Sequence, residues 1–373
     1  MSAPLHGVRV LDFSRVLSGP FASMTLADLG ADVVKVEHPD LPDETRTFGP
    51  PFVDGVSAYY LSTNRGKRAV AFNLKDPDDQ KRAVRLALAA DVILENFRPG
   101  VMERLGLSAN QLRAHKPALI YCSISGFGQD QPRPAYDLII QGMGGIVSLI
   151  GPAGGAPYKV ATSIADLVAG QSAVQAILAA LYRRQQTGEG ATLDVSMLDG
   201  QRAMLVYRAS NWLNAGRAPK RTGNHHASLH PYATYEAADG YLNLAVANDG
   251  QWQAFCRAAE RPDLAADPRF TTNPDRVKHR DALEAVLTAM IKARTRADWL
   301  ERCNRAGVPA GPILSVPEAL DGASVVEHAH PEGGRPVRTV PLPFTMSDAP
   351  RAAERRAPRV GEHNDEVLAE WLK

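Results

Sequence analysis

Short apolar runs alternate with amphipathic segments over the first two hundred residues of this 373-residue chain. The short runs are typical of buried strands, and the segments between them repeat apolar residues at helical spacing. We predict strands at 8–13, 32–37, 69–74, 92–97, 119–125 and 192–197, and helices at about 21–29, 76–90, 163–186 and 198–214. This rhythm predicts an α/β fold, with a large Rossmann-like βαβ domain built on a largely parallel sheet.

The pattern changes after Gly216. Two alternating segments, 232–236 and 241–245, flank a turn that contains Asp239-Gly240, which is typical of an antiparallel hairpin. Helical patterns follow at 252–259, 276–293 and 297–306, strand character returns at 338–344, and a helix is predicted at 365–373. We therefore expect a large domain at 1–215 completed by 326–373, a linker at 216–221, and a smaller α+β domain at 222–325.

Composition excludes several classes of function. The formal net charge is +1, so no field of the whole molecule favours nucleic acid or an anionic membrane. Three widely spaced cysteines, Cys122, Cys256 and Cys303, form no metal-binding pair and no disulfide framework, so no metal is expected. Neither a targeting segment nor an uninterrupted membrane-spanning run is apparent. A cytoplasmic protein without nucleic-acid or membrane partners is the expectation.

Three motifs carry the strongest functional signal. The segment from Glu95 to Gly106, ENFRPGVMERLG, follows the apolar run of a predicted strand. Asn64 to Arg68, NRGKR, and Ser163 to Leu167, SIADL, accompany it. Together they resemble the family III CoA-transferases, a family that also contains α-methylacyl-CoA racemases. The resemblance spans nearly the whole chain and implies acyl-CoA chemistry, an interlocked homodimer, and no cofactor beyond the coenzyme A of the substrate.

Asp166 is the candidate catalytic residue. A structural interpretation is available, because Ser163 and Asp166 have the spacing of a helix capping box. The family resemblance instead makes Asp166 a nucleophile. An aspartate with an ordinary pKa of about 3.9 is ionised at neutral pH and can attack a thioester without a separate base. Aspartyl anhydride and aspartyl-CoA thioester intermediates would follow.

The resemblance also implies residues that bind coenzyme A. They combine basic side chains, helix starts and apolar surface, as a nucleotide thioester requires. At position 38 the family often has arginine, and the histidine here departs from that pattern. The positions that match are Val16, His38, Leu74, Lys75, Asn96, Phe97, Arg98, Arg104 and Tyr136.

Two other functions compete with CoA transfer. The racemases of the family have a histidine before the aspartate at the position of Asp137, and this chain has Tyr136 there. Since a tyrosine with a pKa near 10 suits reversible proton abstraction poorly at neutral pH, we prefer transfer. A non-catalytic CoA-binding protein would not require Asp166. The run Gly142-Met143-Gly144-Gly145 lacks the third glycine of a dinucleotide fingerprint, which argues against NAD binding.

The substrate groups are less well specified. Gly142, Gly144, Gly145 and a loop around Gly250 could supply backbone donors to an oxyanion, although tight packing is the preferred explanation for each glycine taken singly. His225 or His226 could meet an acceptor carboxylate, or lie in a surface loop. The family pattern favours succinyl-CoA as donor and a dicarboxylate such as succinate, glutarate or mesaconate as acceptor. The loop 247–250 lacks a polyglycine run, which makes formate and oxalate less favoured.

Overall fold

The computed structural model describes residues 2–348 and 355–373, so part of the predicted return segment, 349–354, lies outside the described residues. The chain forms two compact units. The first comprises Met1–Val147, Lys159–Arg217 and Ser324–Lys373, and the second comprises Ser148–Tyr158 and Ala218–Ala323. Each unit has a hydrophobic core of its own.

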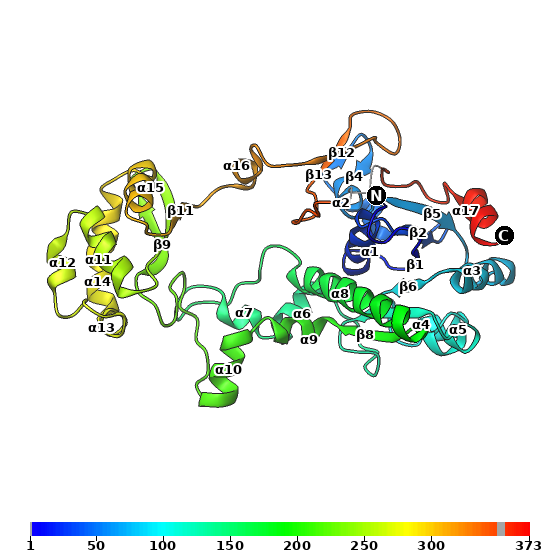
Figure 1. Cartoon of the computed structure of the whole chain (residues 1–373), viewed down its shortest axis with the longest axis horizontal. Helices are drawn as coiled ribbons and strands as arrows, with labels where there is room; N and C mark the ends of the chain where they lie inside the picture. Colours follow the sequence, from blue (N-terminus) through cyan, green and yellow to red (C-terminus); the bar gives the residue numbers. More distant parts are fainter. Residues whose placement is uncertain (1, 349–354) are drawn as a thin grey trace. The chain divides into compact units, whose positions relative to one another are not determined.

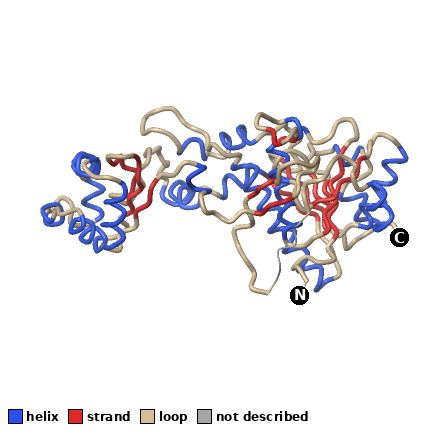
Figure 2. Tube along the Cα trace, turned by 90° about the horizontal axis from the view of Figure 1, so that it is seen from above, coloured by secondary structure: helices blue, strands red, loops and turns tan. Residues whose placement is uncertain are grey.

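A six-stranded parallel sheet forms the centre of the first unit (Figure 2). Its strands, from one edge to the other, are β5 (Lys67–Ala71), β2 (Asp32–Glu37), β1 (Arg9–Asp12), β6 (Val92–Glu95), β7 (Ile120–Ser125) and β8 (Thr192–Ser196). The strand order reverses direction between β1 and β6. In such doubly wound sheets, ligands bind outside the carboxyl ends of the strands at this switch point.

Both faces of the sheet are covered by helices, as expected for a parallel sheet. Alternate residues of one strand enter different cores: Val10 faces the core with α1 (Ser18–Asp28) and α8 (Ile164–Thr187), whereas Leu11 belongs to the core with α3 (Pro77–Ala89). Asp76 caps α3, accepting hydrogen bonds from the backbone of residues 78 and 79. The period-two alternation of the sequence is therefore the alternation between two cores.

Further short elements complete the first unit: η1 (Glu44–Thr47), β3 (Phe52–Val53), β4 (Val56–Ser57), α2 (Ala58–Thr63), α4 (Val101–Arg104), α5 (Ala109–His115), α6 (Asp137–Met143), α7 (Ile146–Leu149), β12 (Val326–His328) and β13 (Val337–Thr339). The predicted helix 198–214 is wrong as a single element. It is divided into α9 (Met197–Ala203) and α10 (Val206–Ala215), because Val206 has a positive φ of 38° that a continuous helix does not allow. The predicted strand 338–344 is likewise limited to β13.

The C-terminal helix α17 (Asn364–Trp371) packs on β5, which is an edge strand (Figure 1). The amide of Ala71 donates to Asn364 over 2.8 Å, and Arg68 pairs with Glu366 and Glu370 at 2.9 and 2.7 Å. These contacts cover a strand edge that would otherwise be open to other chains.

The second unit has an antiparallel sheet in the order β11 (Ala310–Pro312), β10 (Gly240–Ala245), β9 (Tyr232–Ala237). The predicted hairpin is therefore present. The helices of this unit are α11 (Asp249–Ala258), α12 (Pro262–Ala266), α13 (Asn273–Lys278), α14 (Arg280–Lys292), α15 (Arg296–Arg305) and α16 (Val316–Leu320). The single helix predicted at 276–293 is wrong, because the chain is interrupted at His279 between α13 and α14.

Among the described residues, α8 is the one helix whose length and apolar composition would allow it to cross a membrane. Its buried residues, including Ala169, Ala173 and Ile177, belong to the core beneath the parallel sheet. Core helices of soluble proteins often have this length and apolar composition, and the packing of α8 is that of a core helix.

Candidate active site

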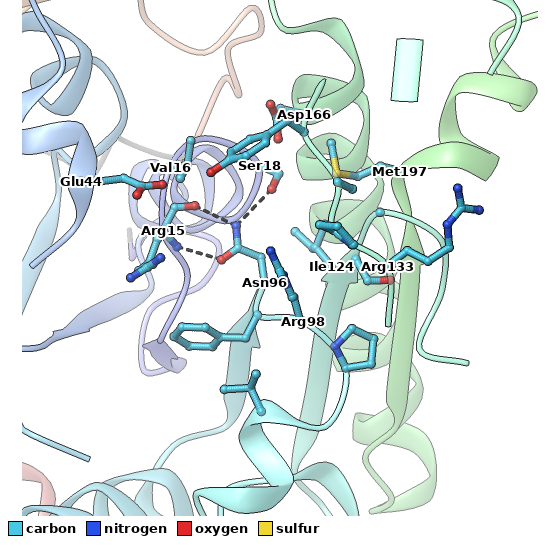
Figure 3. Close-up of a pocket in the computed structure, with 18 residues that line it drawn as sticks. Arg15, Val16, Ser18, Glu44, Asn96, Arg98, Ile124, Arg133, Asp166 and Met197 are labelled. Carbon is cyan, nitrogen blue, oxygen red and sulfur yellow. Dashed lines mark hydrogen bonds between the residues drawn. The ribbon is translucent and has the colours of Figure 1, made fainter. Parts of the chain in front are cut away.

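Asn96 fixes the loop at the switch point of the sheet. It follows β6 directly, and its side-chain oxygen accepts a hydrogen bond from the amide of Arg15 over 2.8 Å. Its amide nitrogen donates to the Arg15 carbonyl over 2.7 Å and to Ser18 Oγ over 3.3 Å (Figure 3). One side chain therefore holds both the loop after β1 and the first turn of α1.

The same loop contains a strained residue. Val16 has a positive φ of 66°, which is unfavourable for a β-branched side chain. Its amide donates to Asp43 Oδ1 over 3.3 Å, and the Lys35 ammonium bonds Asp43 over 2.9 Å and the Ser14 carbonyl over 2.8 Å. Lys35 and Asp43 are fully buried at their side chains, so the loop is held by an ion pair beneath it.

Close packing of two helices brings Ser18 to Asp166. A Cβ at Gly170 of α8 would lie 2.6 Å from the Ser18 carbonyl oxygen and 2.9 Å from the Phe21 ring, so only glycine allows this approach. Ser18 and Asp166 each lie in the first turn of their helix and hydrogen-bond through their side chains.

The start of α8 is capped from another helix. Ser163 occupies the N-cap position but its side chain makes no capping hydrogen bond, so the capping-box interpretation is wrong. Instead, Asp137 Oδ1 of α6 accepts from the amide of Ala165 over 2.8 Å, and Gln141 donates to Asp137 Oδ2 over 2.7 Å. Asp166 is thereby free of the capping role that competed with a chemical one.

Asp166 lines a cavity of about 350 Å³ at the carboxyl ends of the strands. The cavity combines charged groups with apolar side chains, and it includes five of the residues predicted to bind coenzyme A. These five are Val16, Asn96, Phe97, Arg98 and Tyr136. Ser18, Arg15, Arg133 and Glu44 also contribute to its wall.

The carboxyl group of Asp166 is electrostatically unusual. Burial, together with repulsion from Asp137, raises the pKa of Asp166 to about 7, against the opposing effect of the Ser18 hydrogen bond. The expectation that this aspartate has an ordinary pKa is therefore wrong. A carboxylate whose charge is poorly compensated is a stronger nucleophile when ionised than one held by several donors.

A second cavity, of about 370 Å³, lies beside the first. Arg15 and Phe97 line both. The second wall is mostly apolar and includes predicted residues that do not reach the first cavity: His38, Leu74 and Lys75. His38 Nδ1 accepts from the amides of Asp40 and Leu41 over 3.1 and 3.2 Å, which fixes the ring at the rim.

Several predicted site residues lie elsewhere. Arg104 is exposed at the end of α4 and lines neither cavity. A Cβ at Gly144 would lie 2.4 Å from Gln201 Cβ, so close packing accounts for this glycine, and Gly145, with a φ of 92°, is also outside both walls. His225 and His226 belong to the second unit and line neither cavity.

Sequence reasoning missed Ser18 and Arg133, and it did not assign the roles of Arg15 and Asp137. Arg15 adjoins Val16 and was covered only as one of the neighbours of that residue after the first strand. Arg133 stacks over Phe127, with 4.2 Å from its guanidinium carbon to the ring centroid. Ser18 and Asp137 meet Asp166 only through packing of α1, α6 and α8, for which the chain offers no local signal.

The fold and this site define a class: an α/β protein whose switch-point crevice holds one poorly compensated carboxylate beside basic and apolar walls. The model of CoA-transferase family III matches residues 5–364, and the chain belongs to this family. It is 41% identical over 381 residues to the succinate–glutarate CoA-transferase of Agrobacterium fabrum, covering 98% of this chain and 95% of that one. The chain is a CoA-transferase.

Two further matches extend the comparison. An acetyl-CoA:oxalate CoA-transferase of Acetobacter aceti is 43% identical over 322 residues, covering 85% of this chain and 82% of its own. The crystal structure of a CaiB/BaiF family protein from Brucella suis superimposes with a TM-score of 0.88 at 39% identity, with full coverage of both chains. The mixed α/β architecture with a central parallel sheet is therefore that of the family.

Proposed function

We propose that the protein transfers coenzyme A from succinyl-CoA to a second carboxylic acid, with Asp166 as the nucleophile. The observation that carries the proposal is the half-buried Asp166 carboxylate, which accepts a hydrogen bond from Ser18 and has a pKa of about 7, at the wall of the switch-point cavity. This is the arrangement expected of a nucleophile and not of a structural carboxylate.

The proposed first half-reaction ends with coenzyme A on the enzyme. An Asp166 oxygen attacks the thioester carbonyl, the C–S bond breaks, and CoA leaves as a thiolate while a mixed anhydride forms. The thiolate then attacks the aspartyl carbonyl of the anhydride. This step releases the donor acid as a carboxylate and leaves an aspartyl-CoA thioester.

The second half-reaction reverses these steps with another acid. The acceptor carboxylate attacks the aspartyl thioester and displaces CoA thiolate, giving a new anhydride. The thiolate attacks the acceptor's acyl carbonyl, which forms the new acyl-CoA and frees the Asp166 carboxylate. Each step replaces one reactive acyl bond, a thioester or an anhydride, by another of similar reactivity. The main requirement on the site is therefore to exclude water, which would hydrolyse these intermediates.

The two cavities suit the two ends of acyl-CoA. The apolar second cavity, with Lys75 and His38 at its wall, fits an adenine and its phosphates. The first cavity would receive the thioester beside Asp166, and Phe97 and Arg15, shared by both walls, would contact the pantetheine between them. Arg104 would reach only phosphates that project beyond this rim.

The donor and acceptor are proposed from relatives. The Agrobacterium relative is named for succinate and glutarate, and the Acetobacter relative for acetyl-CoA and oxalate. Succinyl-CoA with glutarate is our first choice, because the alignment with the first relative covers nearly all of both chains. The second relative makes oxalate a necessary member of the acceptor panel, although the sequence pattern disfavoured it.

Racemisation receives no support from the residues beside Asp166. Tyr136, which stands at the racemase histidine position, is 68% exposed, and Asp137 is engaged at the start of α8. No histidine is among the described residues that line the cavity, so the histidine–aspartate pair of the racemases is absent from this wall.

A homodimer is part of the proposal. The helix α10 exposes large apolar side chains: Val206, Tyr207, Trp212 and Leu213 are 69%, 52%, 59% and 76% exposed. A row of this kind is typical of a surface that another chain covers. A second copy of this chain is the occupant that the family resemblance implies.

The test is a CoA-exchange assay by mass spectrometry. Succinyl-CoA and acetyl-CoA are each offered with glutarate, oxalate, mesaconate or succinate, using wild type and the isosteric Asp166→Asn variant. We expect glutaryl-CoA from succinyl-CoA only with wild type. Exchange by Asp166→Asn at the wild-type rate contradicts the nucleophile, and exchange confined to other pairs contradicts the substrate assignment. Deuterium incorporation at an acyl α-carbon without exchange would establish racemisation instead.

A further inference from the structure

Three metal-ligating side chains converge in the second unit, in residues that the proposed reaction does not use. His225 Nε2 lies 3.9 Å from Glu284 Oε1, and His230 Nε2 lies 3.8 Å from Glu284 Oε2. One ligand atom from each of the three residues lies within 4.8 Å of the others. The two histidines come from the segment before β9 and the glutamate from α14, so the cluster joins separate elements.

These groups face one another without hydrogen bonds. His230 is completely buried, and neither of its ring nitrogens has a hydrogen-bond partner among the described residues. His225 Nδ1 is also buried and unpartnered in the described chain. A buried imidazole normally has at least one hydrogen-bond partner, and a buried nitrogen without one destabilises the fold unless a ligand satisfies it. The separations of 3.8 and 3.9 Å are too long for direct bonds.

The separations do suit a shared cation. Tetrahedral Zn²⁺ with bonds of about 2.1 Å to nitrogen and oxygen places its ligand atoms roughly 3.4 Å apart. Nε2 of each histidine lies 3.8–3.9 Å from a carboxylate oxygen, so these two separations need to shorten by only a few tenths of an ångström to reach this value. Two histidines and one carboxylate form a recognised zinc ligand set, in which water occupies the fourth position. His225 and Glu284 are 28% and 26% exposed at their side chains, so water can reach the site.

One of the three ligands, Glu284, is held in place by a neighbouring side chain. Tyr235, on β9, donates its hydroxyl to Glu284 Oε2 over 3.1 Å, as expected for a ligating carboxylate held by an outer hydrogen bond. Two arginines lie nearby and oppose a cation. Arg276 is paired with Asp249 at 2.8 Å, and Arg280 donates to the His226 carbonyl over 2.9 Å. Their charge disfavours weakly held ions and leaves the site to a metal that bonds imidazole strongly.

We infer that His225, His230 and Glu284 bind a divalent transition-metal ion of the zinc class. The ion would tie the segment before β9 to α14 and stabilise the second unit. This role is independent of the proposed reaction, since none of the three residues lines the cavity of Asp166. It also removes His225 from the candidates for contact with an acceptor carboxylate.

The test measures metal binding by the full chain without an affinity tag. The protein is treated with a chelator, exchanged into chelator-free buffer, and titrated with Co²⁺ by visible absorption, and with Zn²⁺ in competition with a chromophoric chelator. His225→Ala and Glu284→Gln are the test variants. His226→Ala is the matched control, because its ring packs on Tyr232, with centroids 5.1 Å apart, and is not one of the three ligands.

We expect one equivalent of metal, the visible spectrum of four-coordinate Co²⁺, and affinity at least about tenfold lower in both test variants than in His226→Ala. We also expect Zn²⁺ to raise the Tm of wild type and of His226→Ala. If one test variant does not fold, the metal affinity of the other test variant still shows whether these residues bind the ion. Three results would overturn the site: no stoichiometric binding, equal affinity in test and control variants, or a Co²⁺–thiolate charge-transfer band showing that cysteine is the ligand.

Discussion

Two aspartates of the first unit, the buried Asp43 and the half-buried Asp166, show how the surroundings of a carboxylate decide its role. Asp43 lies beneath the loop that contains Val16, where it accepts hydrogen bonds from Lys35 and Thr45. Burial alone would raise its pKa, but Lys35 and these donors lower the pKa of Asp43 to about 2. Asp166, at the cavity, has Ser18 as its donor and Asp137 as a repelling neighbour, and its pKa is raised to about 7.

This difference in pKa matches a structural role for Asp43 and a chemical role for Asp166. A carboxylate bound by an ammonium and several donors is stable and unreactive, because these groups neutralise its negative charge. A carboxylate that is desolvated and has few hydrogen-bond donors remains nucleophilic when ionised and can attack the carbonyl carbon of a substrate. In the first unit, Asp43 therefore stabilises the strained loop, and Asp166 is the aspartate that would react with substrate.

The largest effect is expected from Asp166→Asn. Removal of the nucleophile should lower kcat by at least about 10³-fold while the fold is retained, because the amide keeps the size of the carboxyl group and can accept from Ser18. Steady-state exchange and the far-UV circular dichroism spectrum check both parts. A kcat within tenfold of wild type would remove the distinction between the two aspartates.

Asp43→Asn should act on stability. It leaves the Lys35 ammonium buried without its closest counter-ion, and breaking a buried pair in this way costs about 3–5 kcal/mol. Urea unfolding of the first unit measures the loss, with Asp40→Asn as the control, since Asp40 is an exposed acid of the same loop. Equal stability of the two variants would show that the ion pair does not hold the loop.

Asn96→Ala tests whether the hydrogen bonds of Asn96 to the Arg15 backbone and to Ser18 position the active site. Without the amide, the Arg15 backbone and Ser18 lose their shared partner, and we expect kcat to fall about 10- to 100-fold with little change in the KM for acyl-CoA. Asn96→Asp, which can keep the bond from the Arg15 amide but not the two donated bonds, should lie between Ala and wild type. A change in KM alone would make Asn96 a binding residue and not a positioning one.

The pH dependence follows from the raised pKa of Asp166. The carboxylate is nucleophilic only when ionised, so single-turnover acylation should rise with pH, reach half of its plateau near pH 7, and be roughly tenfold below the plateau one unit lower. Stability should change in the opposite direction. The folded protein holds this proton more tightly than the unfolded chain, so its contribution to stability falls as pH rises from about 4 to about 7.

Thermal unfolding checks the sign of that stability effect. Asp166→Asn should have a higher Tm than wild type at pH 8, with a smaller difference at pH 5. A pH-independent rate between pH 5 and 8, with equal Tm values for the two proteins, would mean that the pKa of Asp166 is ordinary.

The smallest effect is expected at the second cavity. Lys75→Ala should raise the KM for acyl-CoA about three- to tenfold and leave kcat nearly unchanged, since it removes one charge from a rim exposed to solvent. Lys81→Ala is the matched control: Lys81 is exposed on α3, pairs with Asp78 at 3.0 Å, and lines neither cavity. Equal KM values for the two variants would exclude Lys75 from phosphate binding.

Much of the first unit follows from the sequence pattern, and the reason is local. The predicted strand 32–37 is β2 at the same bounds, because its apolar run ends at a charged residue and a proline. The helix breaks at Val206 and His279 were missed, since apolar spacing continues across both and a backbone torsion leaves no trace in it. At the site, motifs identified Asp166 and Asn96. The raised pKa was not predictable, because it results from burial and from repulsion by Asp137 of another helix, which together outweigh the hydrogen bond from Ser18.

The most direct test of Asp166 as the nucleophile is to trap the covalent intermediate that it forms. Wild type is mixed with succinyl-CoA without acceptor, quenched in acid, and studied by intact-protein and peptide mass spectrometry. A second portion is treated with hydroxylamine, which converts an aspartyl thioester to a hydroxamate. We predict an adduct of one CoA less one water, and a hydroxamate on the peptide that contains Asp166, both absent from Asp166→Asn. An adduct on another residue, or turnover without any modification of this peptide, would show that Asp166 is not the nucleophile.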